Sequence, residues 1–265
     1  MNGIHLLIRL PFVDTAPQEG TSLRIGIMTS LGLKEAVLFD LGNTLVRYWD
    51  RAGFPAVLAE ALAGVQERLR AEGLLRVPAD SLLERAMREN QEAGDHRVRP
   101  LEDRLRRVFD LDQWTPPELM DELCRLFVRP LIVQGRIYDD TLPALDRLRG
   151  QGRRLAVVSN LPWGSPPEMW REEVFRLGIG ERVEAVVFCR DVGWRKPARQ
   201  IFEHALQKLD LPAARCLFVG DDPRWDLNGP RAIGMEALLI DRAGAAGPPA
   251  IRDLRQLLEL LGLRT

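Results

Sequence analysis

The chain has 265 residues, of which 46% are hydrophobic and 28% charged, as in an ordinary soluble globular protein of one large domain or a core with one insertion. Its formal net charge of −1 gives no electrostatic reason to expect nucleic acid or an anionic membrane as a partner. No apolar run approaches the roughly 18 residues of a membrane span, and three widely spaced cysteines favour a reducing cytoplasm over a disulfide framework.

Short apolar runs alternate with amphipathic segments from residue 35 onwards. The runs are continuous, as in strands that are covered on both faces, and they span residues 36–39, 155–158, 183–188, 216–219 and 237–240. Helical patterns lie between or after them, over residues 141–149, 168–177, 198–209, 226–233 and 251–261. This alternation predicts an α/β fold with a doubly wound parallel sheet, a Rossmann-like core.

Residues 50–133 interrupt this alternation with helical spacing alone. The apolar residues predict helices over 54–69, 82–87 and 101–109, and Thr115 to Glu118 is interpreted as a capping box that opens a fourth helix through Phe127. We therefore expect a helical cap over residues 50–133, inserted into a core of residues 34–49 and 134–265. The insertion follows the first strand, so it is expected to cover the edge of the sheet where ligands bind. Residues 1–33 are expected to form an N-terminal extension.

Polar residues follow four of the predicted strands. Asp40 follows the first, Ser159 and Asn160 end the second, and Lys196 lies in a loop after the third. Asp221, Asp222 and Asp226 come after the fourth. Because the carboxyl ends of parallel strands meet at one edge of a sheet, we expect these groups to converge.

The chemistry of these groups is mutually consistent. Carboxylates at Asp40, Asp221 and Asp226 would repel one another without a cation, and oxygen ligands favour a hard ion such as Mg²⁺. A carboxylate beside such an ion can attack phosphorus and form an aspartyl phosphate. Ser159 and Lys196 would hold the oxygens of the transferred group. Only three of the 37 basic residues are lysines, which makes a lysine at this position informative.

The order of these residues resembles the four motifs of the haloacid dehalogenase superfamily of hydrolases. The motifs are Asp40-Leu-Gly-Asn-Thr44, Ser159, Lys196-Pro197, and Gly220-Asp221 with Asp226. The resemblance covers residues 35 to about 240. Within the superfamily, the chain is similar to subfamily I, whose members carry a helical cap between motifs one and two.

The resemblance implies a magnesium-dependent phosphatase that acts on a small phosphorylated metabolite. It implies that Asp40 is the nucleophile, that Thr44 completes the first motif, and that Ser159, Asn160 and Lys196 contact the phosphoryl group. It further implies that Asp40, the Gly42 carbonyl and Asp221 hold the metal, with Asp226 or Asp222 in support.

One position departs from the motif of this family. The residue two after the nucleophile is usually a second aspartate, which protonates the leaving oxygen, and here it is Gly42. A positioned general acid contributes roughly 10²–10⁴ in rate. The substitution predicts one of three outcomes: selection of esters with good leaving groups, replacement of the acid by an ordered water or a cap residue such as Asp95 or His96, or binding with little turnover.

Two further questions stay open from the sequence. The alternative chemistry is carbon–halogen cleavage, since relatives with that activity also lack the second aspartate, although they usually have uncharged residues where Asp221 and Asp222 stand. The second question concerns four tryptophans near the motifs, Trp49, Trp163, Trp194 and Trp225. They form either an aromatic rim for a flat substrate or ordinary packing beneath loops, and the burial typical of tryptophan favours packing.

Overall fold

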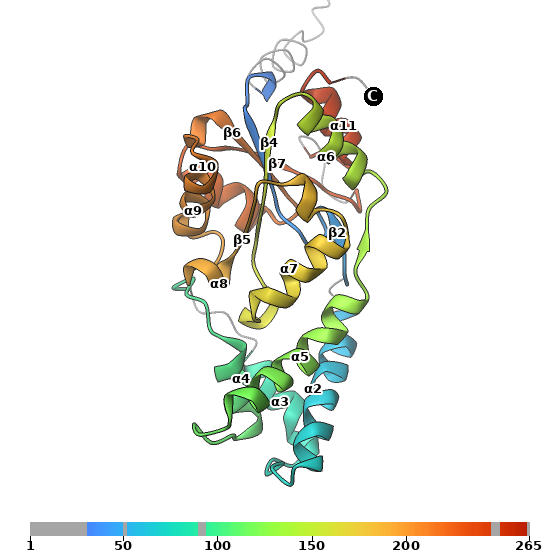
Figure 1. Cartoon of the computed structure of the whole chain (residues 1–265), viewed down its shortest axis with the longest axis vertical. Coiled ribbons are helices and arrows are strands. Elements are labelled where there is room, and N and C mark those ends of the chain that lie inside the picture. Colours follow the sequence, from blue (N-terminus) through green and yellow to red (C-terminus); the bar gives the residue numbers. More distant parts are fainter. Residues whose placement is uncertain (1–30, 50–51, 90–93, 245–249, 264–265) are drawn as a thin grey trace, which may run out of the picture.

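The computed structural model describes residues 31–49, 52–89, 94–244 and 250–263 (Figure 1). The predicted N-terminal extension therefore lies outside the described residues, apart from residues 31–33. Within the described ranges, no helix is both long enough and apolar enough to cross a lipid bilayer.

A five-stranded parallel sheet forms the centre of the larger part of the molecule. Its strands are β1 (Ala36–Phe39), β4 (Arg154–Ser159), β5 (Ala185–Phe188), β6 (Cys216–Gly220) and β7 (Glu236–Leu239). They lie in the order β5-β4-β1-β6-β7, and every adjacent pair is parallel. The predicted doubly wound fold is confirmed, and β1 is fully buried because helices cover both faces of the sheet.

Helices cover the two faces of the sheet in separate groups (Figure 1). One group consists of α6 (Thr141–Gly150), α7 (Pro167–Arg176) and α11 (Leu254–Leu260). The other consists of α8 (Cys189–Val192), α9 (Arg199–Leu209) and α10 (Asn228–Ala232). Short turns of helix join these elements, namely η2 (Pro162–Gly164), η3 (Gly180–Arg182), η4 (Ala213–Arg215) and η5 (Pro223–Leu227).

Four helices form a second layer beyond one end of the sheet (Figure 1). They are α2 (Phe54–Ala71), α3 (Leu82–Glu89), which follows the turn η1 (Ala79–Ser81), α4 (Leu101–Phe109) and α5 (Pro117–Val133). The chain enters this layer after β2 (Val46–Arg47) and returns through β3 (Arg136–Ile137), and these two short strands pair antiparallel. We refer to α2 to α5 as the cap helices.

The start and end of α5 differ from the prediction. Thr115 does not cap the helix, because its hydroxyl donates to the Asp112 carbonyl (2.7 Å) and Pro116 occupies the capping position without a side-chain hydrogen bond. The helix also continues beyond Phe127 through Pro130 to Val133. A proline inside a helix removes one backbone hydrogen bond, and burial of Val128, Pro130 and Leu131 offsets that loss.

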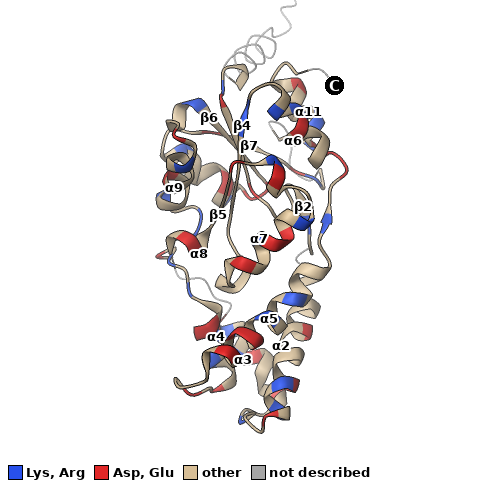
Figure 2. Ribbon diagram, viewed as in Figure 1, with Lys and Arg blue, Asp and Glu red and all other residues tan. Residues whose placement is uncertain are grey.

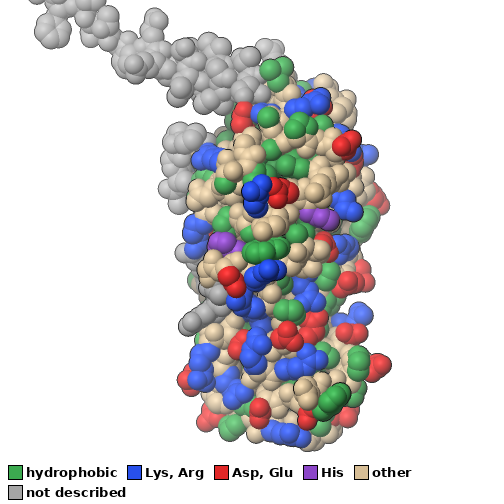
Figure 3. Space-filling model, turned by 90° about the vertical axis from the view of Figure 1, so that its left-hand side faces the viewer, with side chains coloured by type: hydrophobic (Ala, Val, Ile, Leu, Met, Phe, Trp, Pro, Cys, Tyr) green, Lys and Arg blue, Asp and Glu red, His purple; other side chains and the backbone are tan. Residues whose placement is uncertain are grey.

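Charged side chains of both signs are intermixed in the two views drawn in Figures 2 and 3. Figure 2 shows basic and acidic residues on the cap helices as well as on the helices that cover the sheet. On the face drawn in Figure 3, blue and red side chains likewise alternate with apolar ones.

The segment between α3 and α4 also contacts the core, away from β2 and β3. The Arg195 amide donates to the His96 carbonyl (2.8 Å), and the Val98 amide donates to the Gly193 carbonyl (3.1 Å). Gly164 lies directly beneath the same cap segment: a Cβ atom on it would come within 2.1 Å of the Arg99 carbonyl oxygen. The close approach of the two backbones therefore requires glycine at position 164.

We predict that Gly164→Ala destabilises the protein more than Gly73→Ala does. Both glycines have positive φ, +62° and +69°, so alanine at either position has a conformational cost of about 1–2 kcal/mol. Only position 164 adds a clash, since nothing lies within 4 Å of a Cβ atom at Gly73. Urea unfolding of the two variants measures the difference, and equal losses would contradict this account of the cap contact.

Candidate active site

Asp40 lies at the carboxyl end of the central strand. Phe39 of β1 is in register with Val157 of β4 and Val219 of β6, and the Asp40 amide donates to the Val219 carbonyl (2.9 Å). This register brings the residues that follow the three strands to the same edge of the sheet. Asp40 is only 6% exposed, so its carboxylate depends on neighbouring groups rather than on bulk water for its stabilisation.

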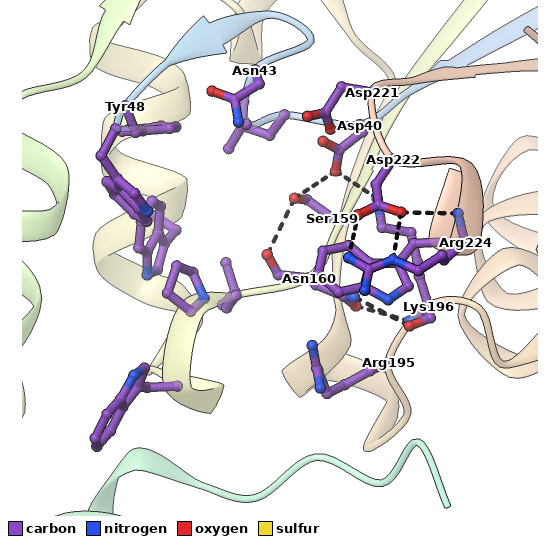
Figure 4. A pocket seen from close by; sticks show the side chains of 18 of the residues that line it. Asp40, Asn43, Tyr48, Ser159, Asn160, Arg195, Lys196, Asp221, Asp222 and Arg224 are labelled. Atoms are coloured by element: carbon purple, nitrogen blue, oxygen red, sulfur yellow. Dashed lines mark hydrogen bonds and ion pairs between the residues drawn. The ribbon is translucent and has the colours of Figure 1, made fainter. Parts of the chain in front are cut away.

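Ser159 and Asn160 connect this strand end to the loop that carries Lys196. The Ser159 hydroxyl donates to Oδ1 of Asp40 (2.9 Å). The Asn160 side chain accepts from the backbone amide of Lys196 (2.8 Å) and donates to the carbonyl of the same residue (3.2 Å). Asn160 thus fixes the backbone of Lys196 from both sides, as the dashed lines in Figure 4 show.

Lys196 places its ammonium group between two buried carboxylates. Its Nζ atom lies 2.5 Å from Oδ1 of Asp40 and 2.7 Å from Oδ1 of Asp226, and the residue is 2% exposed. Burial alone would lower the pKa of Lys196, but the carboxylates of Asp226 and Asp40 hold its pKa above the ordinary value. The group is therefore a fixed positive charge at neutral pH.

Three carboxylates gather around this lysine. One oxygen atom from each of Asp40, Asp221 and Asp226 lies within 4.8 Å of the other two. Burial and the charges of the neighbouring carboxylates raise the pKa of Asp221, and burial raises the pKa of Asp226. When all three are ionised, Lys196 balances one of the three negative charges. The remaining excess and the all-oxygen donor set fit a hard divalent cation.

Asp226 and Asp222 differ in what their oxygens contact. Asp226 is fully buried: one oxygen accepts from Lys196 and the other from the Asp222 amide (3.0 Å). Gly220 leaves the space for it, since a Cβ atom there would lie 2.4 Å from the Asp226 carboxyl group. Asp222 accepts from the guanidinium of Arg224 (3.0 and 2.6 Å). Asp226 therefore orients Lys196, while Asp222 lies outside the three-carboxylate cluster.

A cavity of about 570 Å³ opens in front of these groups (Figure 4). Seven of the predicted site residues line it, namely Asp40, Gly42, Ser159, Asn160, Lys196, Asp221 and Asp222. Asp226 lies behind Lys196, and Thr44 is not among the lining residues. The Thr44 side chain is buried, and its carbonyl accepts from Arg242 (2.6 Å).

Aromatic and basic residues complete the cavity lining. Three of the four tryptophans near the motifs line it, namely Trp49, Trp163 and Trp225. The fourth, Trp194, instead packs against Arg97, whose Cζ atom lies 3.9 Å from the centre of the Trp194 ring. The lining also includes Tyr48, Phe54, Trp170, Arg195 and Arg224, none of which was predicted to be a site residue. Tyr48, Arg195 and Arg224 lie within four residues of a predicted site residue, and this proximity in the sequence is the feature that could have indicated them. Phe54 and Trp170 have no such neighbour.

The two cap residues considered as substitute acids do not lie at the cavity. Asp95 accepts two hydrogen bonds from the Arg99 guanidinium (2.8 and 3.0 Å), which lower the pKa of its carboxyl to about 2. Asp95 therefore carries no proton to donate at neutral pH. His96 is exposed, and neither residue lines the cavity.

Comparison with known proteins identifies the same family along most of the chain. The family described as haloacid dehalogenase-like hydrolases matches residues 34–234. The glyceraldehyde 3-phosphate phosphatase of Methanopyrus kandleri is 28% identical over 211 residues, which is 78% of this chain and 84% of the relative. The phosphoserine phosphatase of Thermus thermophilus is 26% identical over 237 residues, 86% of this chain and 90% of the relative.

Solved structures of two chemistries resemble this fold almost equally. A HAD phosphatase from Thermococcus onnurineus aligns with a TM-score of 0.61 and 25% identity, over 87% of this chain and 99% of that one. A 2-haloacid dehalogenase from Pseudomonas syringae aligns with a TM-score of 0.63 and 27% identity, over 86% and 98%. The fold therefore does not distinguish the two chemistries.

We predict that Lys196→Met lowers the free energy of unfolding by about 3 kcal/mol or more, because it leaves Asp40 and Asp226 buried without their cation. Urea unfolding at pH 7 in EDTA measures this loss. Arg199→Met is the matched control, since the Arg199–Glu203 pair is exposed and contributes at most about 1 kcal/mol. A loss below that of the control would show that Lys196 does not stabilise the carboxylate cluster.

Proposed function

This chain belongs to the haloacid dehalogenase-like hydrolases, and on that premise we propose that it is a magnesium-dependent phosphatase of a small phosphorylated metabolite. The observation that carries the proposal is the contact of Asp40 with both Ser159 and Lys196 beside the carboxylate of Asp221. The relatives named as glyceraldehyde 3-phosphate and phosphoserine phosphatases support a substrate of this class. We place the activity in the cytoplasm, in keeping with three free, buried cysteines.

The proposed reaction proceeds in two steps on Asp40. Its carboxylate attacks the phosphorus atom, an aspartyl phosphate forms, and the bond between phosphorus and the leaving oxygen breaks. Water then attacks the phosphorus, releases inorganic phosphate and regenerates the carboxylate. Ser159 and Lys196 bind the phosphoryl oxygens during both steps, and Lys196 retains one N–H for this role because Asp40 and Asp226 accept only two of its three.

The carboxylate cluster provides the proposed metal site. Asp40, Asp221 and the Gly42 carbonyl would hold Mg²⁺, and Asp226 supports the site by holding Lys196. When bound, Mg²⁺ would neutralise charge on the phosphoryl group and on the carboxylates. Asp222 is bound by Arg224 and would contribute only indirectly.

Gly42 makes the proposed enzyme slow or selective for the leaving group. In the first step the leaving oxygen acquires negative charge, and no carboxylic acid stands at position 42 to protonate it. Phosphoryl transfer still proceeds when the leaving group stabilises its own charge. Binding of a phosphorylated ligand with little turnover is the limiting case of the same proposal.

Carbon–halogen cleavage is the second candidate, because it also uses an aspartate nucleophile and needs no acid at position 42. The solved structure of a 2-haloacid dehalogenase with a similar fold favours it. The carboxylate cluster opposes it: Asp221 stands beside Asp40 and Asp226, where relatives with that activity usually have an uncharged residue, and carbon–halogen cleavage makes no use of a cation site there.

We predict that EDTA abolishes phosphate release and that added Mg²⁺ restores it, because the carboxylate cluster cannot accept a phosphate dianion without a cation. Release of inorganic phosphate from acetyl phosphate measures the effect. Asp40→Asn is the companion variant and is expected to be inactive with and without metal. Halide release from 2-chloropropionate that persists in EDTA would instead establish the dehalogenase.

We predict that Gly42→Asp raises the turnover of alkyl phosphate monoesters at least tenfold, since it restores an acid worth roughly 10²–10⁴ in rate. A Cβ atom at this position would lie 3.8 Å from the Tyr48 ring, an ordinary contact, so the variant is expected to fold. Gly42→Asn is the matched control, with nearly the same size and no acidic proton to transfer to the leaving oxygen. An equal effect of both substitutions would show that protonation of the leaving group does not limit the rate.

A further inference from the structure

Four aromatic side chains form a continuous wall of the cavity. Tyr48 lies 5.5 Å from Trp49 and 5.5 Å from Trp170, and Trp49 lies 5.8 Å from Phe54, measured between ring centres. All four residues line the cavity, and we refer to Tyr48, Trp49, Phe54 and Trp170 as the aromatic wall. Figure 4 shows Tyr48 on the opposite side of the cavity from Asp40 and Asp221.

The aromatic wall begins where an acid at position 42 would stand. A Cβ atom on Gly42 would meet the Tyr48 ring at 3.8 Å, so the space beside Gly42 is bounded by that ring. The carboxylates among the lining residues are Asp40, Asp221 and Asp222, and all three follow β1 or β6 on the opposite side. A leaving group beside Gly42 therefore meets aromatic rings and no carboxylic acid of the described lining.

The Tyr48 hydroxyl is a poor substitute for that acid. Its oxygen is buried and has no hydrogen-bond partner among the described residues. Burial and the nearby Glu173 carboxylate raise the pKa of this phenol, so it retains its proton. Glu173 itself accepts two hydrogen bonds from Arg176 (2.7 Å each) and does not line the cavity.

We propose that the substrates of this site are aryl phosphates, monoesters whose leaving group is a phenol. This inference rests on the proposed phosphatase function and specifies its substrate class. A phenol has a pKa near 10, against about 16 for water and simple alcohols, so a phenolate can leave without a proton from the protein. The ring of such a substrate packs on the aromatic wall while the phosphoryl group lies at Asp40.

In the first step, the aryl oxygen keeps the electron pair of the broken bond to phosphorus and leaves as a phenolate, which takes a proton from bulk water after release. The phosphoryl group is transferred to Asp40. Water then hydrolyses the aspartyl phosphate, and phosphate carries away the oxygen of that water. No oxidant, reductant or protein acid is required.

Four substrates distinguish the effect of the aromatic ring from the effect of the acidity of the leaving group. Phenyl phosphate has both a ring and an acidic leaving group; benzyl phosphate has the ring with an alcohol; acetyl phosphate has an acidic leaving group without a ring; propyl phosphate has neither. We expect kcat/KM for phenyl phosphate to exceed that for benzyl phosphate by about 10² or more, the contribution of a missing acid. We also expect the KM of phenyl phosphate to lie below that of acetyl phosphate.

Variants of the wall test its contact with the ring. Trp49→Ala should raise the KM of phenyl phosphate about three- to tenfold more than that of acetyl phosphate, because aromatic pairs contribute about 0.5–1.5 kcal/mol. Trp114→Ala is the matched control, since Trp114 is 79% exposed on the cap and does not line the cavity. An equal KM effect of Trp49→Ala on both substrates would overturn the assignment of the ring to the wall.

Three further results would overturn the aryl phosphate proposal or the phosphatase proposal beneath it. Tyr48→Phe keeps the ring and removes the hydroxyl, so a selective collapse of benzyl phosphate hydrolysis would identify Tyr48 as an acid and overturn the proposal. Hydrolysis of acetyl and phenyl phosphate that requires Asp40 and Mg²⁺, but without preference for phenyl phosphate, would leave the phosphatase standing and reject the aryl class. No release of phosphate from any of the four substrates would reject both the aryl class and phosphatase turnover.

Discussion

The site is organised by the ammonium group of Lys196, which is buried between Asp40 and Asp226. An isolated buried charge is strongly unfavourable, so each of these groups depends on the others for its stabilisation. Removal of one would leave a buried charge without its partner. Lys196 comes from the loop after α8, Asp40 from the end of β1 and Asp226 from η5. One ion triad therefore joins three segments that are far apart in the sequence and fixes Asp40, the proposed nucleophile, relative to the groups proposed to hold phosphate.

The positions of these residues could be predicted because a parallel sheet converts sequence order into spatial proximity. The continuous apolar strands determine where Asp40, Ser159 and Asp221 emerge, and the register of β1 with β4 and β6 makes them neighbours. Thr44 was harder to place, because its side chain is buried outside the cavity even though it stands within the first motif.

The aromatic lining could not be predicted in the same way. Trp170 reaches the cavity from α7 through its contact with Tyr48, and no spacing in the sequence indicates that contact. The end of α5 was missed for a related reason: the apolar pattern predicted a helix through Phe127, whereas burial of Val128, Pro130 and Leu131 accompanies its continuation to Val133. In both cases tertiary packing determines the structure, and the periodicity of apolar residues in the sequence carries no information about that packing.

The two linkers of the cap meet at the aromatic wall. Tyr48 lies on the outgoing linker and packs against Gly135 on the returning one, where a Cβ atom would come within 2.7 Å of its ring. Phe54 begins the first cap helix, while Trp170 belongs to the core. The wall is thus built from both layers, and its shape depends on how the cap is seated. On the other side of the cap, the backbone hydrogen bonds of His96 and Val98 with the loop of Gly193 and Arg195 fix the position of the cap, directly beside Lys196. The same loop therefore positions Lys196 and anchors the cap, so in the proposed phosphatase the choice of substrate would be coupled to the geometry around Asp40.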